Sequence, residues 1–85
     1  MSVINKEYVK FHLCEVIDDA TQLIAELEQR DDFELEELEV VFRGIFHHLN
    51  TAWNARFATA DCVLECKESD FRAWRAFPRD IDMEL

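Results

Sequence analysis

The stretch that decides the fold runs from Asn5 to Arg30 and reads NKEYVKFHLCEVIDDATQLIAELEQR. Apolar side chains recur along it at steps of four and three residues, and Ile17 and Ile24 widen the stripe that they form. The stripe consists of Val9, Leu13, Val16, Ala20, Leu23 and Leu27. At about 100° per residue these positions share one side of an α-helix. The spacing therefore predicts a long amphipathic helix over residues 5–30, with Asn5 as its N-cap.

A second stripe with the same spacing follows a short polar break. It consists of Leu35, Leu38, Phe42, Ile45, Leu49 and Ala52, with Phe46, Trp53 and Phe57 beside it. Asp31 or Asp32 is expected to cap a helix over residues 34–58, whose first turn is rich in glutamate. A short link between two long helices favours an antiparallel hairpin, with the two stripes packed into one seam.

The C-terminal part adds a shorter element to this hairpin. Ser69 is expected to cap a short helix over residues 70–76, which Pro78 ends, and residues 80–85 are expected to form a flexible tail. The stretch 61–67 fits a helical turn or an extended segment. A two-helix hairpin needs a third layer. Either the short helix supplies it, or a second copy of the chain completes a four-helix bundle by dimerisation.

The composition agrees with a single all-α domain of 85 residues. The chain is 49% hydrophobic, which is too much for a disordered protein despite its net charge of -10. One Gly and one Pro are too few for the turns of a β-sheet. No apolar run is long enough to span a membrane, and residues 1–8 lack the apolar core of a signal peptide. We therefore expect a cytoplasmic protein with three reduced cysteines.

Negative charge is concentrated in the first half of the chain. Residues 1–42 contain twelve acids and three bases, net -9, whereas residues 43–85 contain seven acids and six bases, net -1. Residues 31–39 alone contain six acids. Because such a surface repels phosphate, we expect no direct nucleic-acid binding and no membrane binding. One alternative function is an acidic decoy, whose carboxylates replace phosphates in the basic nucleic-acid-binding cleft of a partner.

The sequence contains no recognisable catalytic or cofactor-binding set. His47 and His48 point about 100° apart on a helix, and neither belongs to a Glu-x-x-His motif. Cys62 and Cys66 lack the usual zinc spacing, so two half-buried structural thiols are favoured over a thiol or metal sensor. A single glycine leaves no phosphate-binding loop or nucleophile elbow. We expect no enzyme activity, no metal and no cofactor.

The segment 71–79 is the candidate protein-binding site. Its aromatic and arginine side chains are types enriched at binding hot spots: Phe71, Arg72, Trp74, Arg75, Phe77 and Arg79. In the alternative interpretation, the aromatic residues close the groove of the hairpin and the arginines pair with the acidic run 34–39. The sequence thus favours a non-catalytic helical protein-interaction module, whose partner is another protein or a second copy of itself.

Arg56 stands at the centre of the second stripe, where an aliphatic residue is expected. Its long side chain can reach water at the end of the seam. Alternatively, it forms an ion pair with Glu7 or Glu15 of the first helix, which an antiparallel hairpin brings near. The two interpretations place Arg56 outside or inside the hairpin interface.

Overall fold

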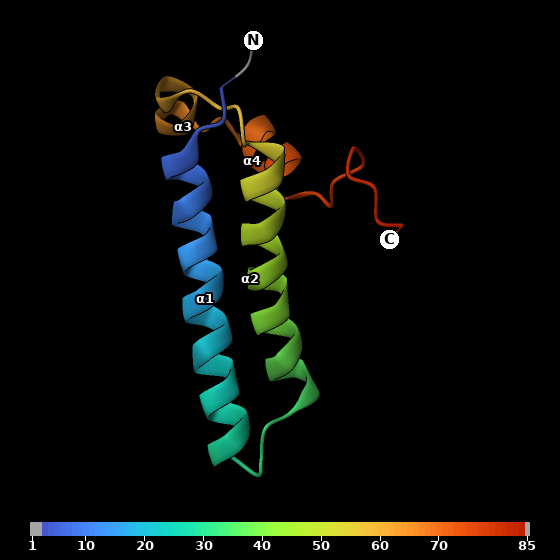
Figure 1. Cartoon of the computed structure of the whole chain (residues 1–85). Helices are drawn as coiled ribbons and strands as arrows, with labels where there is room; N and C mark the ends of the chain where they lie inside the picture. Colours follow the sequence, from blue (N-terminus) through green and yellow to red (C-terminus); the bar gives the residue numbers. More distant parts are fainter. Residues whose placement is uncertain (1–2, 85) are drawn as a thin grey trace.

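The computed structural model describes residues 3–84, and the regular structure in that range is entirely helical. Two long helices, α1 (Lys6–Gln29) and α2 (Leu35–Asn54), lie side by side (Figure 1). Two short helices, α3 (Ala60–Glu65) and α4 (Glu68–Arg75), follow at one end of this pair. The prediction of an all-α chain is confirmed.

The two long helices run in opposite directions and touch at both ends (Figure 1). At the start of α1, the Asn5 backbone N–H donates to the Arg56 carbonyl at 2.7 Å. At the far end, the Arg30 guanidinium pairs with the Glu37 carboxylate at 3.1 Å. We call the end that carries α3 and α4 the head, and the end formed by the link 30–34 the tip.

Side-chain hydrogen bonds mark where the two long helices begin. The Asn5 side chain accepts the Tyr8 N–H at 3.1 Å, which confirms the predicted N-cap of α1. The cap of α2 is Glu34, so the prediction of an aspartate cap is wrong. Glu34 and Glu37 form a capping box, in which the Glu34 N–H donates to the Glu37 carboxylate at 3.0 Å. The Glu37 side chain, three residues into α2, can accept the backbone N–H of Glu34. This reciprocal pair of hydrogen bonds fixes the first residue of α2.

The elements after α2 differ in extent from those expected. The undecided stretch 61–67 contains α3, which Thr59 caps by accepting the Cys62 N–H at 3.3 Å. Cys66 ends α3 in the left-handed region, with φ 31. α4 begins two residues before the expected helix, with Lys67 rather than Ser69 at its N-cap. The final residue of the expected tail lies outside the described range.

α1 and α2 meet along a line of small and polar residues, which we call the contact line. A Cβ atom built on Gly44 would lie 3.8 Å from the Asp19 carboxylate, so these two positions face each other. His12 and His48 touch through their Nδ1 atoms at 2.9 Å. The contact line consists of His12, Asp19, Leu23, Gly44, His48, Thr51, Ala52 and Ala55.

Of the predicted stripes, Leu23 and Ala52 lie on the contact line, whereas most of the larger side chains lie beside it. Seven of their large side chains are between 40% and 62% exposed. They are Leu13, Ile17, Ile24, Leu27, Phe42, Phe46 and Leu49, and we call the surface that they form the apolar face. The prediction that the stripes bury each other in a seam holds for Leu23 and Ala52 and is wrong for these seven side chains. Small residues about a quarter turn away let the two backbones approach, and this leaves both stripes on the same side of the layer.

The described chain has little core of its own. Its buried apolar residues are Leu23, Ala52 and Ala55, which are 6%, 6% and 2% exposed. The radius of gyration is 15.0 Å, whereas about 12 Å is typical of a compact domain of this length. A single layer of two helices cannot enclose a core. The apolar face is therefore the open side of the layer.

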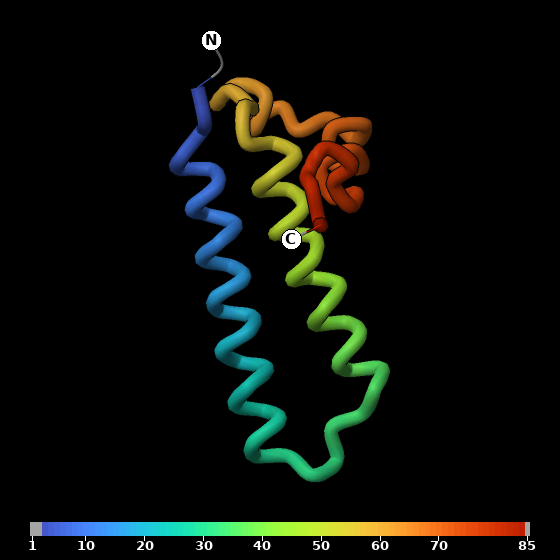
Figure 2. Tube along the Cα trace, turned by 45° about the vertical axis from the view of Figure 1, so that its right-hand side comes forward, coloured from blue at the N-terminus to red at the C-terminus, as the bar shows by residue number. Residues whose placement is uncertain are grey.

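Helix α4 lies against α2 near the head (Figure 2). The Asn54 amide donates to three main-chain carbonyls around the end of α4, those of Ala73, Trp74 and Ala76, at 3.3, 2.8 and 2.7 Å. Asn50 donates to the Arg75 carbonyl at 3.0 Å. Two asparagines one turn apart therefore satisfy the carbonyls that the last turn of α4 leaves without helical partners.

Candidate interaction surface

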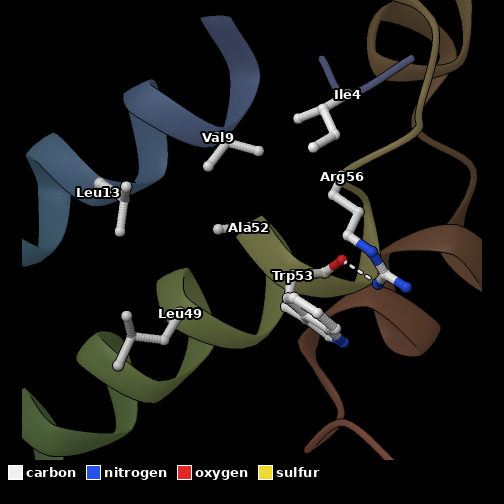
Figure 3. A pocket seen from close by; sticks show the side chains of 7 residues that line it. All are labelled: Ile4, Val9, Leu13, Leu49, Ala52, Trp53 and Arg56. Atoms are coloured by element: carbon white, nitrogen blue, oxygen red, sulfur yellow. Dashed lines mark hydrogen bonds between the residues drawn. The ribbon is translucent and has the colours of Figure 1, made fainter. Parts of the chain in front are cut away.

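The apolar face is hollowed near the head. The hollow has a volume of roughly 270 Å³ (Figure 3). Its lining side chains come from α1 and the residues just before it, and from α2 and the residues just after it. Its lining residues are Ile4, Val9, Leu13, Leu49, Ala52, Trp53 and Arg56. Arg56 is the one charged residue among them. A hollow of this chemistry fits an aliphatic or aromatic side chain.

Arg56 borders the hollow at the head. Its guanidinium lies 4.0 Å from the centre of the Trp53 ring, and it donates to the Trp53 carbonyl at 2.7 Å (Figure 3). It also pairs with Asp80 at 3.0 Å, so the alternative interpretation of an ion pair with Glu7 or Glu15 is wrong. The segment after α4 brings Asp80 close to the end of α2, and this nearer carboxylate takes the ion pair.

Asp80 fastens the last described segment to α2. It accepts the Trp53 indole N–H at 2.8 Å as well as the Arg56 guanidinium. These hydrogen bonds, with that from Trp53 the larger influence, hold the pKa of the Asp80 carboxyl below its usual value. Arg56 and Asp80 together fix the Trp53 ring as a wall of the hollow, because each contacts a different part of the indole.

The aromatic residues of the candidate segment 71–79 lie in different surroundings. Phe71 packs against His47, with ring centres 5.4 Å apart and ring planes tilted by 46°. Phe77 instead lies 6.3 Å from Phe46, a member of the apolar face. Trp74 is half-buried, and its ring approaches Tyr8 at 6.2 Å. The three aromatics therefore contribute to three separate contacts along the head.

The arginines of the candidate segment lie far from the acidic run that was expected to meet them. Arg72 pairs with Glu68 inside α4 at 2.8 Å, and the Arg75 guanidinium lies 5.4 Å from the centre of the Phe71 ring. Arg79 is exposed. Pairing with residues 34–39 is excluded, because that run lies at the tip whereas α4 lies at the head (Figure 1).

Three histidines meet where α1 crosses the middle of α2. His12 is 5% exposed, and burial, followed by His48 and then His47, lowers its pKa to about 4. Burial is also the largest cause that lowers the pKa of His47. At 2.9 Å one of the two Nδ1 atoms of His12 and His48 donates and the other accepts, so the accepting nitrogen carries no proton in this contact. This cluster holds the two helices together.

Residues 3–84 contain no assembled candidate metal site. No group of three or more His, Cys, Asp or Glu in that range is placed to hold a metal ion. Cys14, Cys62 and Cys66 are free thiols on exposed positions. The prediction that Cys62 and Cys66 are half-buried is therefore wrong, because α3 makes few contacts and leaves both side chains in solvent.

The contact line was not predicted, although the sequence contains a signal for it. His12 and Asp19 are seven residues apart on α1, and Gly44 and Thr51 are seven apart on α2. Small or polar residues repeated every seven positions beside an apolar stripe mark a separate face of a helix. The large aliphatic stripes are the stronger pattern, and the seam between the helices was therefore predicted to lie along them.

Comparison with protein-family models, curated proteins and solved structures finds no match for this chain. Within the described residues, no helix combines the length and apolar character needed to cross a bilayer. The function therefore has to be argued from the surface alone.

Proposed function

We propose that this chain is a non-catalytic helical protein-interaction module that binds its partner through the apolar face. One observation carries the proposal: seven large apolar side chains lie 40–62% exposed on one side of a two-helix layer. At roughly 150–200 Å² for a fully exposed side chain of this size, they present about 600 Å² of apolar surface. Monomeric soluble proteins rarely expose a larger continuous patch, and patches of this size are often functional.

The energy available from this surface is sufficient for specific binding. Removing about 600 Å² of apolar area from water stabilises a complex by roughly 15 kcal/mol before the costs of association. The loss of translational and rotational freedom costs about 4–15 kcal/mol. The expected partner surface is also apolar and helical, because two parallel ridges with a shallow hollow accept helices most readily.

A second candidate function uses the tip in place of the apolar face. Residues 26–39 contain eight acids and one base, net -7. This density of carboxylates is what an acidic decoy would present to the basic cleft of a nucleic-acid-binding protein. Salt separates the two proposals. Binding through the apolar face persists as the ionic strength rises, whereas binding through the tip weakens steeply.

The proposed function is tested by placing a photo-crosslinking amino acid at Ile17 in the protein expressed in cells. Ile17 is 62% exposed on the apolar face, and Val40, 63% exposed and outside it, is the matched control. The expected result is a discrete adduct from position 17 that is absent from position 40. Equal or absent labelling at the two positions would show that the apolar face has no partner. The mass of the adduct reports whether the partner is this chain or another protein.

A further inference from the structure

Resting on the proposed function, we propose that the apolar face is occupied by a second copy of this chain, packed tip to head. The two α1–α2 layers then form an antiparallel four-helix bundle. The dyad runs across the layer at the level of Asp19 and Gly44. In this arrangement α1 lies on α1 of the second copy, and α2 lies on α2.

The apolar rows have the symmetry that this dyad requires. The row on α1 extends from Leu13 to Leu27 and is centred near residue 20, and the row on α2 is centred near residue 45. Those two centres lie within about two residues, roughly 3 Å, of the same height, because Gly44 faces Asp19 across the contact line. A two-fold axis near that level carries each row approximately onto itself and places Leu13 close to Leu27 of the second copy. An unrelated partner would not require the two centres to coincide.

The area of the face also fits a second copy. A stable interface buries about 800 Å² on each partner. The exposed side chains supply about 600 Å² of this area, and half-buried neighbours in the same rows, such as Val16, Ile45 and Trp53, add to it. Covering the face would give each layer the core that it lacks alone, since the described chain buries three apolar residues.

Charge selects the tip-to-head orientation. The tip segment 26–39 carries net -7, whereas the head segments 6–10 and 56–84 contain seven bases and eight acids, net -1. A tip-to-head pair keeps the two acidic tips at opposite ends of a body that is 50 Å long. That separation exceeds the Debye length of about 8 Å at physiological salt. The opposite orientation would set two tips of net -7 side by side.

One pair of residues on the rim of α1 is placed to join the two copies. Lys10 and Glu28 are five helical turns apart and therefore share one edge of α1. Each lies nine residues from Asp19, one towards the head and the other towards the tip. The dyad thus brings Lys10 of each copy to Glu28 of the other. Among the described residues of its own chain, the ion pair of Lys10 is an exposed contact of 3.8 Å with Glu7.

Light scattering after size exclusion, over a wide range of protein concentration, tests the second copy. The expected result is a dimer for the native chain, a monomer for Ile17→Glu and a dimer for Val40→Glu. The two variants add the same charge at positions of 62% and 63% exposure, so they differ only in the face that they alter. Far-ultraviolet circular dichroism should remain helical for both. A native chain that stays monomeric throughout would overturn the proposal, and so would a Val40→Glu monomer.

The orientation is tested by zero-length carbodiimide crosslinking of a mixture of ¹⁵N-labelled and unlabelled chains. Lys10 and Glu28 of one chain are about 27 Å apart along α1, so a bond between them can form only between copies. The expected result is a Lys10–Glu28 crosslink of mixed isotopic mass. Lys10→Glu and Glu28→Lys should each weaken dimerisation roughly tenfold, and the double variant should restore it. Crosslinks from Lys10 only to residues of the partner's head would overturn the orientation.

The outcomes separate this inference from the proposed function. A monomeric native chain whose position 17 still crosslinks to a protein of another mass would reject the second copy and support the interaction module. A monomer without any adduct from position 17 would reject both.

Discussion

The contact line and the apolar face lie about a quarter turn apart on the same two helices, and they use opposite side chains. The contact line holds a glycine, two alanines, a threonine, an aspartate and two histidines around a single leucine, Leu23. The apolar face holds only Leu, Ile and Phe. Small residues allow close approach of two backbones but bury little area, whereas large aliphatic residues bury much area when another layer covers them. The contact line therefore pairs the two helices, whereas the apolar face, on another side of the same helices, carries the area that another layer could bury.

The largest expected difference between the two sides comes from two leucines one turn apart. Leu23 is 6% exposed on the contact line, and Leu27 is 48% exposed on the apolar face. We expect Leu23→Ala to lower the free energy of unfolding by about 3–4 kcal/mol, and Leu27→Ala by about 1 kcal/mol. Urea denaturation at a protein concentration below that of self-association measures both. Equal losses would mean that the two sides are equally buried in the isolated chain.

The pH dependence of stability tests the contact line through its buried histidine, His12. Burial lowers the pKa of His12 from 6.5 to about 4, so the unfolded chain binds this proton more tightly than the folded chain. Stability is therefore complete above about pH 6.5 and falls as the pH drops towards 4. Between pH 7 and pH 5 we expect a loss of about 2 kcal/mol in urea denaturation. His12→Gln should flatten this dependence, and an unchanged slope in that variant would assign the effect to other groups.

Substitutions at the head should lower the free energy of unfolding by less than Leu23→Ala does, because hydrogen bonds attach α4 to α2. Asn54→Ala removes the donor to three carbonyls at 2.7–3.3 Å, and we expect it to cost about 1–2 kcal/mol. Amide hydrogen exchange should rise in α4 and remain unchanged in α1. Asn50→Ala, which removes one such bond, is the matched control and should cost less. Uniform exchange changes along the whole chain would show that α4 folds as one unit with the long helices.

The smallest expected effect is a gain in stability on the contact line. A methyl group at Gly44 would meet the Asp19 carboxylate at 3.8 Å, an ordinary van der Waals contact. Because glycine costs more backbone entropy than alanine in a helix, Gly44→Ala should raise the free energy of unfolding by about 0.5–1 kcal/mol. Thermal melting measures this gain. A loss of stability would mean that the helices need to approach more closely than this distance indicates.

Much of the local structure follows from the sequence. The spacing of apolar residues predicted both long helices, and Asn5 was identified as a cap from its residue type and place. These features depend on side chains within about four positions of one another, and such neighbours are fixed by the helix itself. The capping box at Glu34 is also local, but two aspartates just upstream offered an equally good signal.

The sequence alone determined an acidic, helical chain with two apolar stripes and a basic, aromatic C-terminal segment. Only the tertiary structure decided which side of each helix meets the other. That choice depends on the distance between two backbones, and here Gly44, Thr51 and Ala52 set it through small volume and not through hydrophobicity. The tertiary structure also brought Asp80 into hydrogen bonds with Trp53 and Arg56. It placed Phe71 and Phe77 of the segment 71–79 in separate contacts. Contacts between residues more than 20 positions apart depend on how the chain folds back, and helical periodicity carries no information about that return.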